Sequence, residues 1–201
     1  KDRATALLKL ADRIEAAANE LATLESQNCG KPHAAVLADE IPAIADVFRF
    51  FAGAARAMHG AVAGEYLAGF TSMIRRDPVG VIASIAPWNY PLLMAAWKIA
   101  PALAAGNTVV LKPSEQTPLS SLRLAHLAAD LFPPGVFNVI CGRGASVGAP
   151  LVAHPQVAMI SLTGDVATGE KILAAAAKGT RRTHLELGGK APVIVFDDAD
   201  L

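Results

Sequence analysis

The sequence predicts an α/β fold in which a doubly wound parallel sheet follows a group of N-terminal helices. Two observations carry this prediction. From residue 79 onward, short apolar runs alternate with helical segments, and such an alternation forms parallel sheets covered by helices. Hydrophobic residues make up 53% of the 201 residues, which is enough for a buried core.

Two long helices are predicted before the sheet. Residues 1–28 carry apolar side chains at the i, i+3, i+4 spacing of an amphipathic helix, and residues 28–32 end that helix. A second helix is expected over residues 34–58 with a bend at Pro42, and its cluster at residues 47–51 is expected in the core. Its acidic residues are expected on the solvent side: Asp39, Glu40 and Asp46.

The strands and helices of the sheet are then expected in alternating order. Strands are predicted at residues 73–76, 79–86, 107–111, 135–140 and 157–162. Helices are predicted at residues 92–105, 117–131, 146–153 and 167–178. A last apolar run, at residues 193–196, also has the composition of a strand.

Charge and cysteine content narrow the class of protein. Eighteen basic residues balance eighteen acidic ones, so bulk charge favours neither a nucleic acid nor a membrane surface as partner. Cys29 and Cys141 are far apart and lack metal-ligand spacing, which favours a reducing, cytoplasmic compartment and gives no metal site. No apolar run is long enough to span a bilayer, so no membrane partner is expected.

The stretch T-H-L-E-L-G-G-K, residues 183–190, holds a candidate general base. Glu186 is expected at a strand end between Leu185 and Leu187, and an apolar collar that disfavours the charged carboxylate suits a base working near pH 7. The glycine pair that follows would let the backbone turn sharply and lie against a flat partner. A solvated glutamate or an ion-pair partner is the alternative interpretation.

The loops after the predicted strands are the other candidate sites, because α/β sheets bind ligands there. Asn89, in the loop P-W-N-Y-P, could donate its amide to a developing oxyanion or cap the following helix. Gly164 and Gly169 place G-x-x-x-x-G at a helix start, where backbone amides favour phosphate, although the spacing alone is weak. Lys112 beside Glu115 suits ribose hydroxyls, and a carboxylate there would repel a 2′-phosphate and so favour NAD over NADP.

Four motifs in this order resemble the aldehyde dehydrogenase superfamily: P-W-N-Y-P, K-P-S-E-Q-T-P, S-L-T-G with a glycine five residues after its own, and L-E-L-G-G-K-A-P. The segments F-R-F-F-A-G-A-A-R, G-E-Y-L, S-M-I-R-R-D-P and A-P-W-N-Y-P are similar to bacterial γ-aminobutyraldehyde dehydrogenases, relatives of the betaine aldehyde dehydrogenases. The resemblance covers essentially the whole chain. It implies a Rossmann-like NAD-binding domain at residues 71–201, preceded by its helical part at residues 1–70.

The resemblance also implies roles for individual residues. Glu186 would activate the water that hydrolyses a thioester, Asn89 would donate to the oxyanion, and Lys98 would support the orientation of Asn89. The implied NAD-binding residues are Ile85, Ala86, Trp88, Lys112, Ser114, Glu115, Gly144, Gly148, Leu162, Thr163, Gly164, Asp165, Thr168, Leu187 and Gly188. Asp165 stands where most relatives have a small hydroxyl residue, and its charge would repel the pyrophosphate unless the side chain turns outward.

Two regions of the family are expected to be missing. The resemblance places the nucleophilic cysteine beyond residue 190, past the end of this chain, together with most of the substrate-binding domain and the oligomerisation strands. Neither Cys29 nor Cys141 lies where that nucleophile would be. The chain is therefore expected to be a fragment, truncated at both ends and inactive alone, of a homo-oligomeric enzyme.

An ω-aminoaldehyde such as 4-aminobutanal is the expected substrate. Tyr90, Met94 and Trp97 lie at helical spacing after the P-W-N-Y-P loop, and two of them offer π faces to an ammonium group, while Glu40 could add negative potential. Core packing explains such a stripe equally simply. The alternatives for the chain as a whole are a generic aliphatic or betaine aldehyde dehydrogenase, a non-catalytic NAD-binding fragment, and a reductase-like relative, against which a water-activating Glu186 argues.

Overall fold

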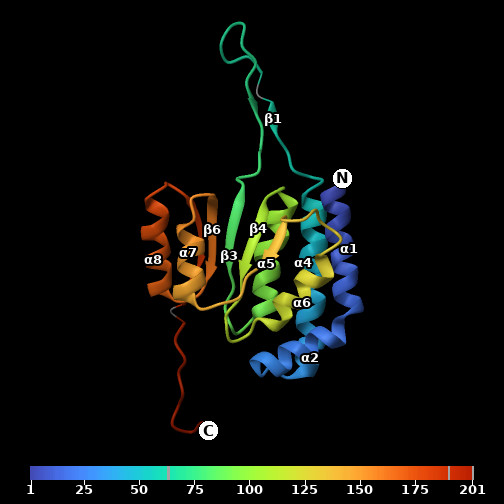
Figure 1. Ribbon diagram of the computed structural model, residues 1–201, viewed down its shortest axis with the longest axis vertical. Helices are drawn as coiled ribbons and strands as arrows, with labels where there is room; N and C mark the ends of the chain where they lie inside the picture. Colours follow the sequence, from blue (N-terminus) through green and yellow to red (C-terminus); the bar gives the residue numbers. More distant parts are fainter. Residues whose placement is uncertain (63, 190, 201) are drawn as a thin grey trace.

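The computed structural model describes residues 1–62, 64–189 and 191–200. Its centre is a five-stranded parallel sheet with the order β5-β4-β3-β6-β7 (Figure 1). The strands are β3 (Val81–Ile85), β4 (Thr108–Lys112), β5 (Phe137–Val139), β6 (Val157–Thr163) and β7 (Arg182–Glu186). Strands β3 to β6 lie within a residue or two of predicted strands, and β7 ends at Glu186, where a strand end was expected, so the predicted fold class is confirmed.

The first strand of the sheet, β3, lies at its centre. From β3 the chain moves outward to β4 and β5, then crosses to the other side of β3 and continues to β6 and β7. The connecting helices are α5 (Pro91–Ala104), α6 (Leu119–Ala128), α7 (Ala149–Ala153) and α8 (Val166–Ala177). The strand order therefore reverses between β3 and β6, where doubly wound sheets open a crevice at the carboxyl ends of their strands.

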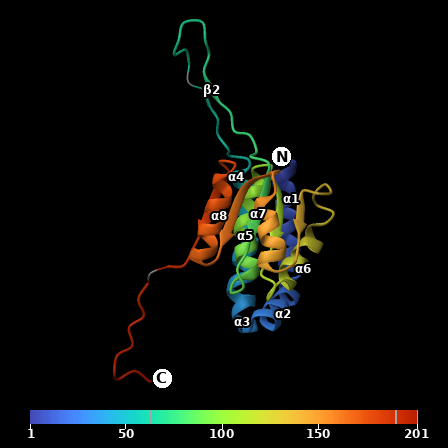
Figure 2. The ribbon, with the colours of Figure 1, turned by 60° about the vertical axis from the view of Figure 1, so that its left-hand side comes forward.

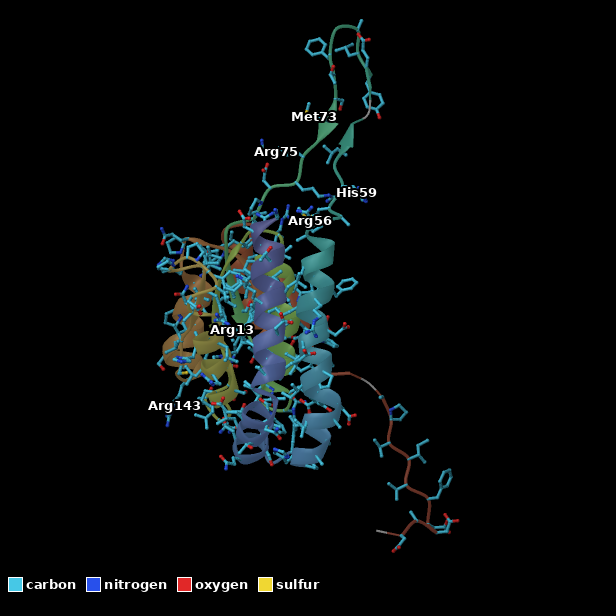
Figure 3. The ribbon with its side chains drawn as sticks, turned by 90° about the vertical axis from the view of Figure 1, so that its right-hand side faces the viewer. Arg13, Arg56, His59, Met73, Arg75 and Arg143 are labelled. Carbon is cyan, nitrogen blue, oxygen red and sulfur yellow. The ribbon has the colours of Figure 1, made fainter. Side chains whose placement is uncertain are left out.

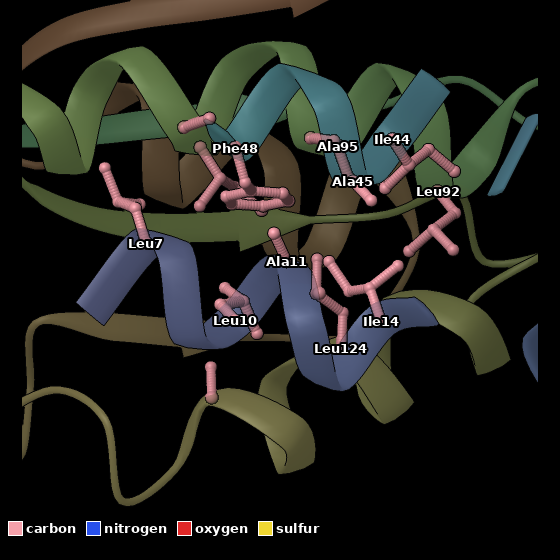
Figure 4. Close-up of a cluster of buried hydrophobic side chains, with 14 of the residues drawn as sticks. Leu7, Leu10, Ala11, Ile14, Ile44, Ala45, Phe48, Leu92, Ala95 and Leu124 are labelled. Atoms are coloured by element: carbon pink, nitrogen blue, oxygen red, sulfur yellow. The ribbon is translucent and has the colours of Figure 1, made fainter. Parts of the chain in front are cut away.

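Helices cover both faces of the sheet because neighbouring residues of a strand point to opposite sides. On β3, Ile82 belongs to a large cluster that includes α1, α4, α5 and α6, and Ala83 belongs to a smaller cluster with α7 and α8. Figure 4 shows the larger cluster, in which Leu7, Phe48 and Leu92 come from three different helices. The sheet is thus doubly wound, as predicted.

The predicted N-terminal helices are broken into shorter elements. The single helix expected over residues 1–28 is two helices, because the chain bends at Ala17 with φ −97° and ψ 15°. The single helix expected over residues 34–58 is a short helix, a π-helical turn and a longer helix that has Pro42 in its first turn, where proline is tolerated. The elements are α1 (Asp2–Ala16), α2 (Ala18–Cys29), α3 (His33–Ala35), η1 (Val36–Glu40) and α4 (Ile41–Ala54).

The aromatic cluster of α4 is only partly in the core. Phe48 is fully buried, but Phe50 is 65% exposed and lies edge-to-face against Phe51. The expectation that the whole cluster is core is therefore wrong for Phe50. Another π-helical turn, η2 (Gly144–Gly148), replaces the first residues of the predicted helix at 146–153.

A β-hairpin projects from the edge of the sheet opposite the carboxyl ends of the strands (Figures 1 and 2). It consists of β1 (Ala61–Val62) and β2 (Met73–Ile74), which pair antiparallel, so the short strand expected at residues 73–76 is present. Its exposed apolar side chains include Leu67, Phe70 and Met73, and Figure 3 places Met73 far from the helices.

The strand expected at residues 193–196 is not formed. These residues have no regular secondary structure, and Val193 is 90% exposed. A β-strand needs a hydrogen-bonded partner, and the segment extends away from the sheet (Figures 1 and 2). Within the described residues, no helix is both long and apolar enough to cross a membrane.

Candidate active site

A cleft of about 470 Å³ opens at the carboxyl ends of β3, β4, β6 and β7. Its described lining residues are Ile85, Ala86, Pro87, Trp88, Asn89, Lys112, Ser114, Glu115, Thr163, Gly164, Asp165, Glu186, Leu187 and Gly188. All except Pro87 are among the site residues that the sequence predicts. A larger cleft of about 740 Å³ lies at the opposite edge of the sheet, and its described lining includes none of the predicted site residues.

The loop after β3 brings Asn89 to the cleft. Asn89 is exposed and its side chain is not used as a helix cap, because the N-cap residue of α5 is Tyr90, with no side-chain cap hydrogen bond there. The interpretation of Asn89 as a helix cap is therefore wrong. Its amide is left available to a ligand in the cleft.

The end of β4 brings a lysine and a glutamate together. Lys112 is buried, and its Nζ donates to the backbone oxygen of Pro113 at 2.9 Å and to Oε2 of Glu115 at 3.3 Å. Backbone hydrogen bonding within Glu115 and the nearby lysine lower the pKa of Glu115 below its ordinary value. The pair thus presents a fixed carboxylate, about half exposed, to the cleft.

The loop after β6 carries an unexpected helix cap. Asp165 Oδ1 accepts from the backbone N–H of Thr168 at 2.9 Å, and Oδ2 accepts from the Thr168 hydroxyl at 2.7 Å. The carboxylate is turned to the first turn of α8, and the hydrogen bonds from Thr168 lower the pKa of Asp165. One donor at this helix N-terminus is therefore satisfied by the protein itself.

The glycines of G-x-x-x-x-G have packing roles. A Cβ added at Gly169 would lie 2.8 Å from Cδ1 of Leu187, so any larger residue there would displace the Leu187 side chain. A Cβ at Gly164 would lie 3.2 Å from Cδ1 of Leu162. At Gly188, which lines the cleft, an added Cβ would meet no atom of the described residues within 4 Å. Lys190 lies outside the described residues.

Glu186 ends β7 at the rim of the cleft, but the apolar collar predicted around it is wrong. Leu185 and Leu187 pack with the α7–α8 cluster, on the face of the strand opposite to Glu186. The Glu186 side chain is 65% exposed, and its Oε1 lies 3.4 Å from Nε2 of His184.

Lys98 lies beneath the same face of the sheet on α5. It is 7% exposed, and its Nζ donates to Oγ of Ser161 at 3.1 Å. Burial lowers the pKa of Lys98 to about 8, although attraction to Glu186 opposes the shift. The described contacts of Lys98 therefore connect it to β6 rather than to Asn89, whose orientation it was expected to support.

Several predicted residues lie outside the described lining of the cleft. Gly148 faces the aliphatic part of Lys112, which would be 3.5 Å from an added Cβ, and Leu162 lies beneath Gly164. Gly144 begins the π-helical turn η2 and is exposed. The substrate candidates lie on α5 and its N-cap: Tyr90 and Trp97 are exposed and Met94 is half-buried.

The remaining substrate candidate, Glu40, belongs to a buried ion cluster. Its Oε2 lies 2.6 Å from Nζ of Lys31, which also contacts Oε2 of Glu25 at 3.2 Å. The same ammonium lies 4.1 Å from the centre of the Tyr90 ring. Glu40 is thus next to Tyr90 and paired with Lys31 at 13% side-chain exposure, so the expectation of a solvent-facing carboxylate is wrong here.

Comparison with known proteins identifies the family. The family model described as "Aldehyde dehydrogenase family" matches residues 1–201. The chain belongs to the aldehyde dehydrogenase family. It is 50% identical over 197 residues to a probable aldehyde dehydrogenase of Streptomyces coelicolor, covering 98% of this chain and 39% of that protein.

Two further aldehyde dehydrogenases are similar over the same length. A betaine aldehyde dehydrogenase of Cereibacter sphaeroides is 49% identical, covering 100% of this chain and 41% of that protein. The NAD⁺ complex of an aldehyde dehydrogenase from Bacillus cereus is 42% identical with a TM-score of 0.92, covering 98% of this chain and 40% of that one. The chain therefore spans about two fifths of the length of these aldehyde dehydrogenases.

Sequence reasoning missed three residues near the site of this aldehyde dehydrogenase chain. His184 could have been found from the alternation of the strand, because it stands two residues before Glu186 and so shares its face. Ser161 becomes a neighbour of His184 only through the pairing of β6 with β7, which the sequence does not reveal. Lys31 is distant in sequence from Tyr90 and carried no local signal.

Proposed function

We propose that this chain is the NAD-binding part of an enzyme that oxidises an aldehyde to a carboxylate. The observation that carries the proposal is the one cleft that is lined by Asn89 and Glu186 and also by Lys112 and Glu115. Family membership supports the same reaction class. A generic aliphatic or betaine aldehyde is the broader substrate class, since relatives of nearly equal identity differ in name.

The residues around the cleft fit NAD. Glu115, held by Lys112, offers a carboxylate to ribose hydroxyls and repels a 2′-phosphate, which favours NAD over NADP. Gly164 adds no side chain beside the start of α8, where Asp165 already takes the Thr168 amide, so a pyrophosphate would be left with the remaining backbone donors of this turn. When bound, NAD would supply the hydride acceptor.

The protein's own groups would act on the aldehyde carbon. Asn89 would donate a hydrogen bond to the aldehyde oxygen as negative charge develops on it. Glu186 would take a proton from the water that hydrolyses the acyl group. The nucleophilic thiol would come from outside these 201 residues, because the described lining of the cleft includes neither Cys29 nor Cys141, and burial raises the pKa of Cys29.

Replacing the proposed base tests this assignment. In the full-length enzyme, Glu186→Gln should leave acylation and hydride transfer intact and slow hydrolysis, giving a burst of NADH followed by a steady rate lowered by at least about 100-fold. Glu170→Gln, at an exposed glutamate on α8, is the matched control and should behave as wild type. A variant that loses the burst itself would show that Glu186 acts before hydrolysis.

We also propose that the 201 residues alone bind NAD without oxidising aldehydes. Intrinsic tryptophan fluorescence should change on adding NAD, since Trp88 lines the cleft. NADH formation from an aldehyde by the isolated chain, abolished by Cys141→Ser, would overturn this part. The exposed apolar side chains of the β1–β2 hairpin support the proposal that the full-length enzyme is a homo-oligomer. The two free cysteines support the proposal of a cytoplasmic location.

The finer substrate proposal is an ω-aminoaldehyde such as 4-aminobutanal. Tyr90 and Trp97 expose aromatic surface along α5, with Met94 between them, and a cation on such a face gains about 0.5 to 2 kcal/mol. Lys31 occupies one face of Tyr90 and pairs with Glu40, so Trp97 is the stronger candidate for the ammonium.

A ratio of two substrates of equal length tests this preference. Trp97→Leu in the full-length enzyme should lower kcat/KM for 4-aminobutanal by roughly two- to thirtyfold and leave pentanal little affected. Tyr90→Leu should have a smaller selective effect. Equal losses for the two aldehydes would assign both aromatic residues to shaping the site and remove the preference for an amine.

A further inference from the structure

A second cleft, larger than the one that holds Glu186, has no part in the proposed function. It has a volume of about 740 Å³ and lies at the amino ends of the strands, the edge of the sheet from which the β1–β2 hairpin projects (Figure 1). Its described lining comes from residues 77–79 before β3, residues 178–182 between α8 and β7, and four residues of the connection from α7 into β6. It is called here the amino-edge cleft.

Half of the described lining of the amino-edge cleft is apolar. Six of the twelve lining residues are proline, valine or alanine: Pro78, Val79, Ala153, Pro155, Val157 and Ala158. Apolar surface gains free energy when another molecule covers it, whereas a small inorganic ion would leave most of this lining in water. The lining therefore suits a stretch of polypeptide better than a free anion.

The guanidinium of Arg181 is directed into the protein. Its Nη1 donates to the backbone oxygens of Val152 and His154 at the end of α7, and its Nη2 donates to that of Ala175 in α8 at 2.8 Å. These carbonyls belong to the negative ends of two helices, so Arg181 weakens a field that would disfavour an anion in the cleft. Its Nε is buried and has no hydrogen-bond partner among the described residues.

Two other cations of the cleft are unpaired. Lys178 and Arg182 are exposed, and neither forms an ion pair with a described residue. The one acidic residue of the described lining, Asp77, is already paired with Arg75, whose Nη2 lies 2.8 Å from Oδ1 of Asp77. The cleft thus carries net positive charge in a chain whose eighteen basic and eighteen acidic residues balance.

A strained turn carries both unpaired cations. Thr180, with φ 53°, is the only described non-glycine residue in the left-handed region. A β-branched residue rarely adopts this conformation, which persists only where its surroundings hold it and which is commonest at functional sites. Here the backbone N–H of Arg181 donates to the oxygen of Ala176 at 3.0 Å and fixes the turn to α8. The turn thereby brings Lys178 and Arg182 into the lining of one cleft.

We propose that the amino-edge cleft is the docking site of an acidic segment of the same polypeptide that lies outside these 201 residues. A carboxylate of that segment pairs with Lys178 and Arg182, and its neighbouring residues cover the apolar lining. The chain spans about two fifths of the length of its relatives, so the remainder of a full-length enzyme would supply the segment. The proposal does not depend on NAD binding or aldehyde oxidation.

The size of the cleft favours a tethered segment over a second copy of the chain. Twelve described residues line it, whereas a stable interface between two proteins uses about 20 to 30 residues a side. A segment of the same chain binds within one molecule, at an effective concentration on the order of millimolar, so a small surface with two cations is sufficient.

Carbodiimide cross-linking of the full-length enzyme tests the contact, because this reagent joins a lysine amine only to a carboxylate that touches it. Digestion and mass spectrometry should find Lys178 joined to an aspartate or glutamate outside residues 1–201. Lys171, an exposed lysine on α8, is the control and should give no such link. A mixture of isotope-labelled and unlabelled enzyme shows whether the two joined peptides come from one copy.

Amine acylation of the same enzyme measures whether the cleft is covered. Lys178 should react at least about fivefold more slowly than Lys171, because its amine is held in the docked contact. Arg182→Gln removes one of the two cations and should raise the rate at Lys178 by roughly two- to fivefold while leaving Lys171 unchanged. Circular dichroism checks that this variant is folded, and the cross-link in wild type is an independent measurement if it is not.

Three outcomes would overturn the proposal. Equal acylation of Lys178 and Lys171 would show an open cleft, and protection of Lys178 only after adding inorganic phosphate would assign the cleft to a small anion. No cross-link from Lys178 to a residue outside 1–201, or such links only between copies, would remove the tethered segment. Loss of NAD binding or of aldehyde oxidation would bear on the proposed function alone.

Discussion

The ammonium of Lys31 lies 4.1 Å from the centre of the Tyr90 ring while it pairs with the carboxylates of Glu25 and Glu40. Glu25 is 1% exposed and also accepts a hydrogen bond from Ser120 at the start of α6. The lysine therefore joins α2, the π-helical turn η1 and the residue that follows Asn89. Burial alone would lower the pKa of Lys31. The hydrogen bonds and charges of Glu40 and Glu25 together raise it by more, so the net shift of the pKa is upward.

Removing this lysine should destabilise the protein strongly. Lys31→Met leaves Glu25 buried without its cation, and breaking a buried pair on one side costs about 3 to 5 kcal/mol. Urea unfolding monitored by circular dichroism measures this loss. The double variant Glu25→Gln with Lys31→Met should recover part of it, because the uncompensated charge is gone.

Lys171→Met, at an exposed lysine on α8, is the control for the loss of one positive charge and should change the free energy of unfolding by less than about 0.5 kcal/mol. If Lys31→Met were as mild as Lys171→Met, the cluster would be a solvated surface pair. The interpretation that Lys31 stabilises the fold by joining α2, η1 and Tyr90 would then be wrong.

Asp165 should separate helix capping from cofactor binding. Asp165→Ser keeps a capping oxygen for Thr168 and removes a negative charge beside the cleft, so the Tm should hold and NAD should bind more tightly. Asp165→Ala removes both, so the Tm should fall while NAD affinity still rises. Thermal unfolding and tryptophan fluorescence titration measure the two effects, and unchanged NAD affinity in both variants would place the carboxylate away from the pyrophosphate.

Because the ammonium of Lys98 is buried, the free energy of unfolding should increase as the pH rises and Lys98 loses its proton. Its pKa is about 8 in the folded chain against an ordinary value of 10.5, so between these values the unfolded chain binds more protons and the free energy of unfolding rises with pH. The full rise is about 3 kcal/mol. Lys98→Met should abolish it, whereas Lys171→Met should keep it. Urea unfolding at about pH 7.5 and about pH 10.5 provides the comparison, and parallel pH dependence of wild type and Lys98→Met would exclude a buried ammonium.

Strands β3, β4, β5 and β6 were predictable because each lies in a short apolar run, and the carboxyl ends of parallel strands meet at one edge of the sheet. This edge alone brings Asn89, Lys112 and Glu186 together from distant parts of the sequence. The break at Ala17 was not predictable, since alanine is the best helix former. It arises in the tertiary structure, where α1 packs along α4 and α2 turns to pack against α6.

Contacts across strands explain what the sequence missed in the site. The leucines that flank Glu186 in the sequence suggested an apolar collar, yet strand alternation sends them to the opposite face. Glu186 contacts His184 within β7, and His184 in turn contacts Ser161 only because of the register between β6 and β7. An apolar run such as residues 193–196 likewise forms a strand only where a partner strand is present.

The position of β3 at the centre of the sheet has a consequence for the order of folding. The segments that first meet β3 are close in sequence, namely β4 and the helices around it, and they enclose the larger core. The β6–β7 half pairs with β3 across a longer stretch of sequence and rests on the smaller core, so we expect it to join later. Backbone amides of β7, at the edge of the sheet, should therefore exchange with solvent by local opening well before those of β3 and β4. The proposed base is thus carried by an edge strand, which we expect to open more readily than the centre of the sheet.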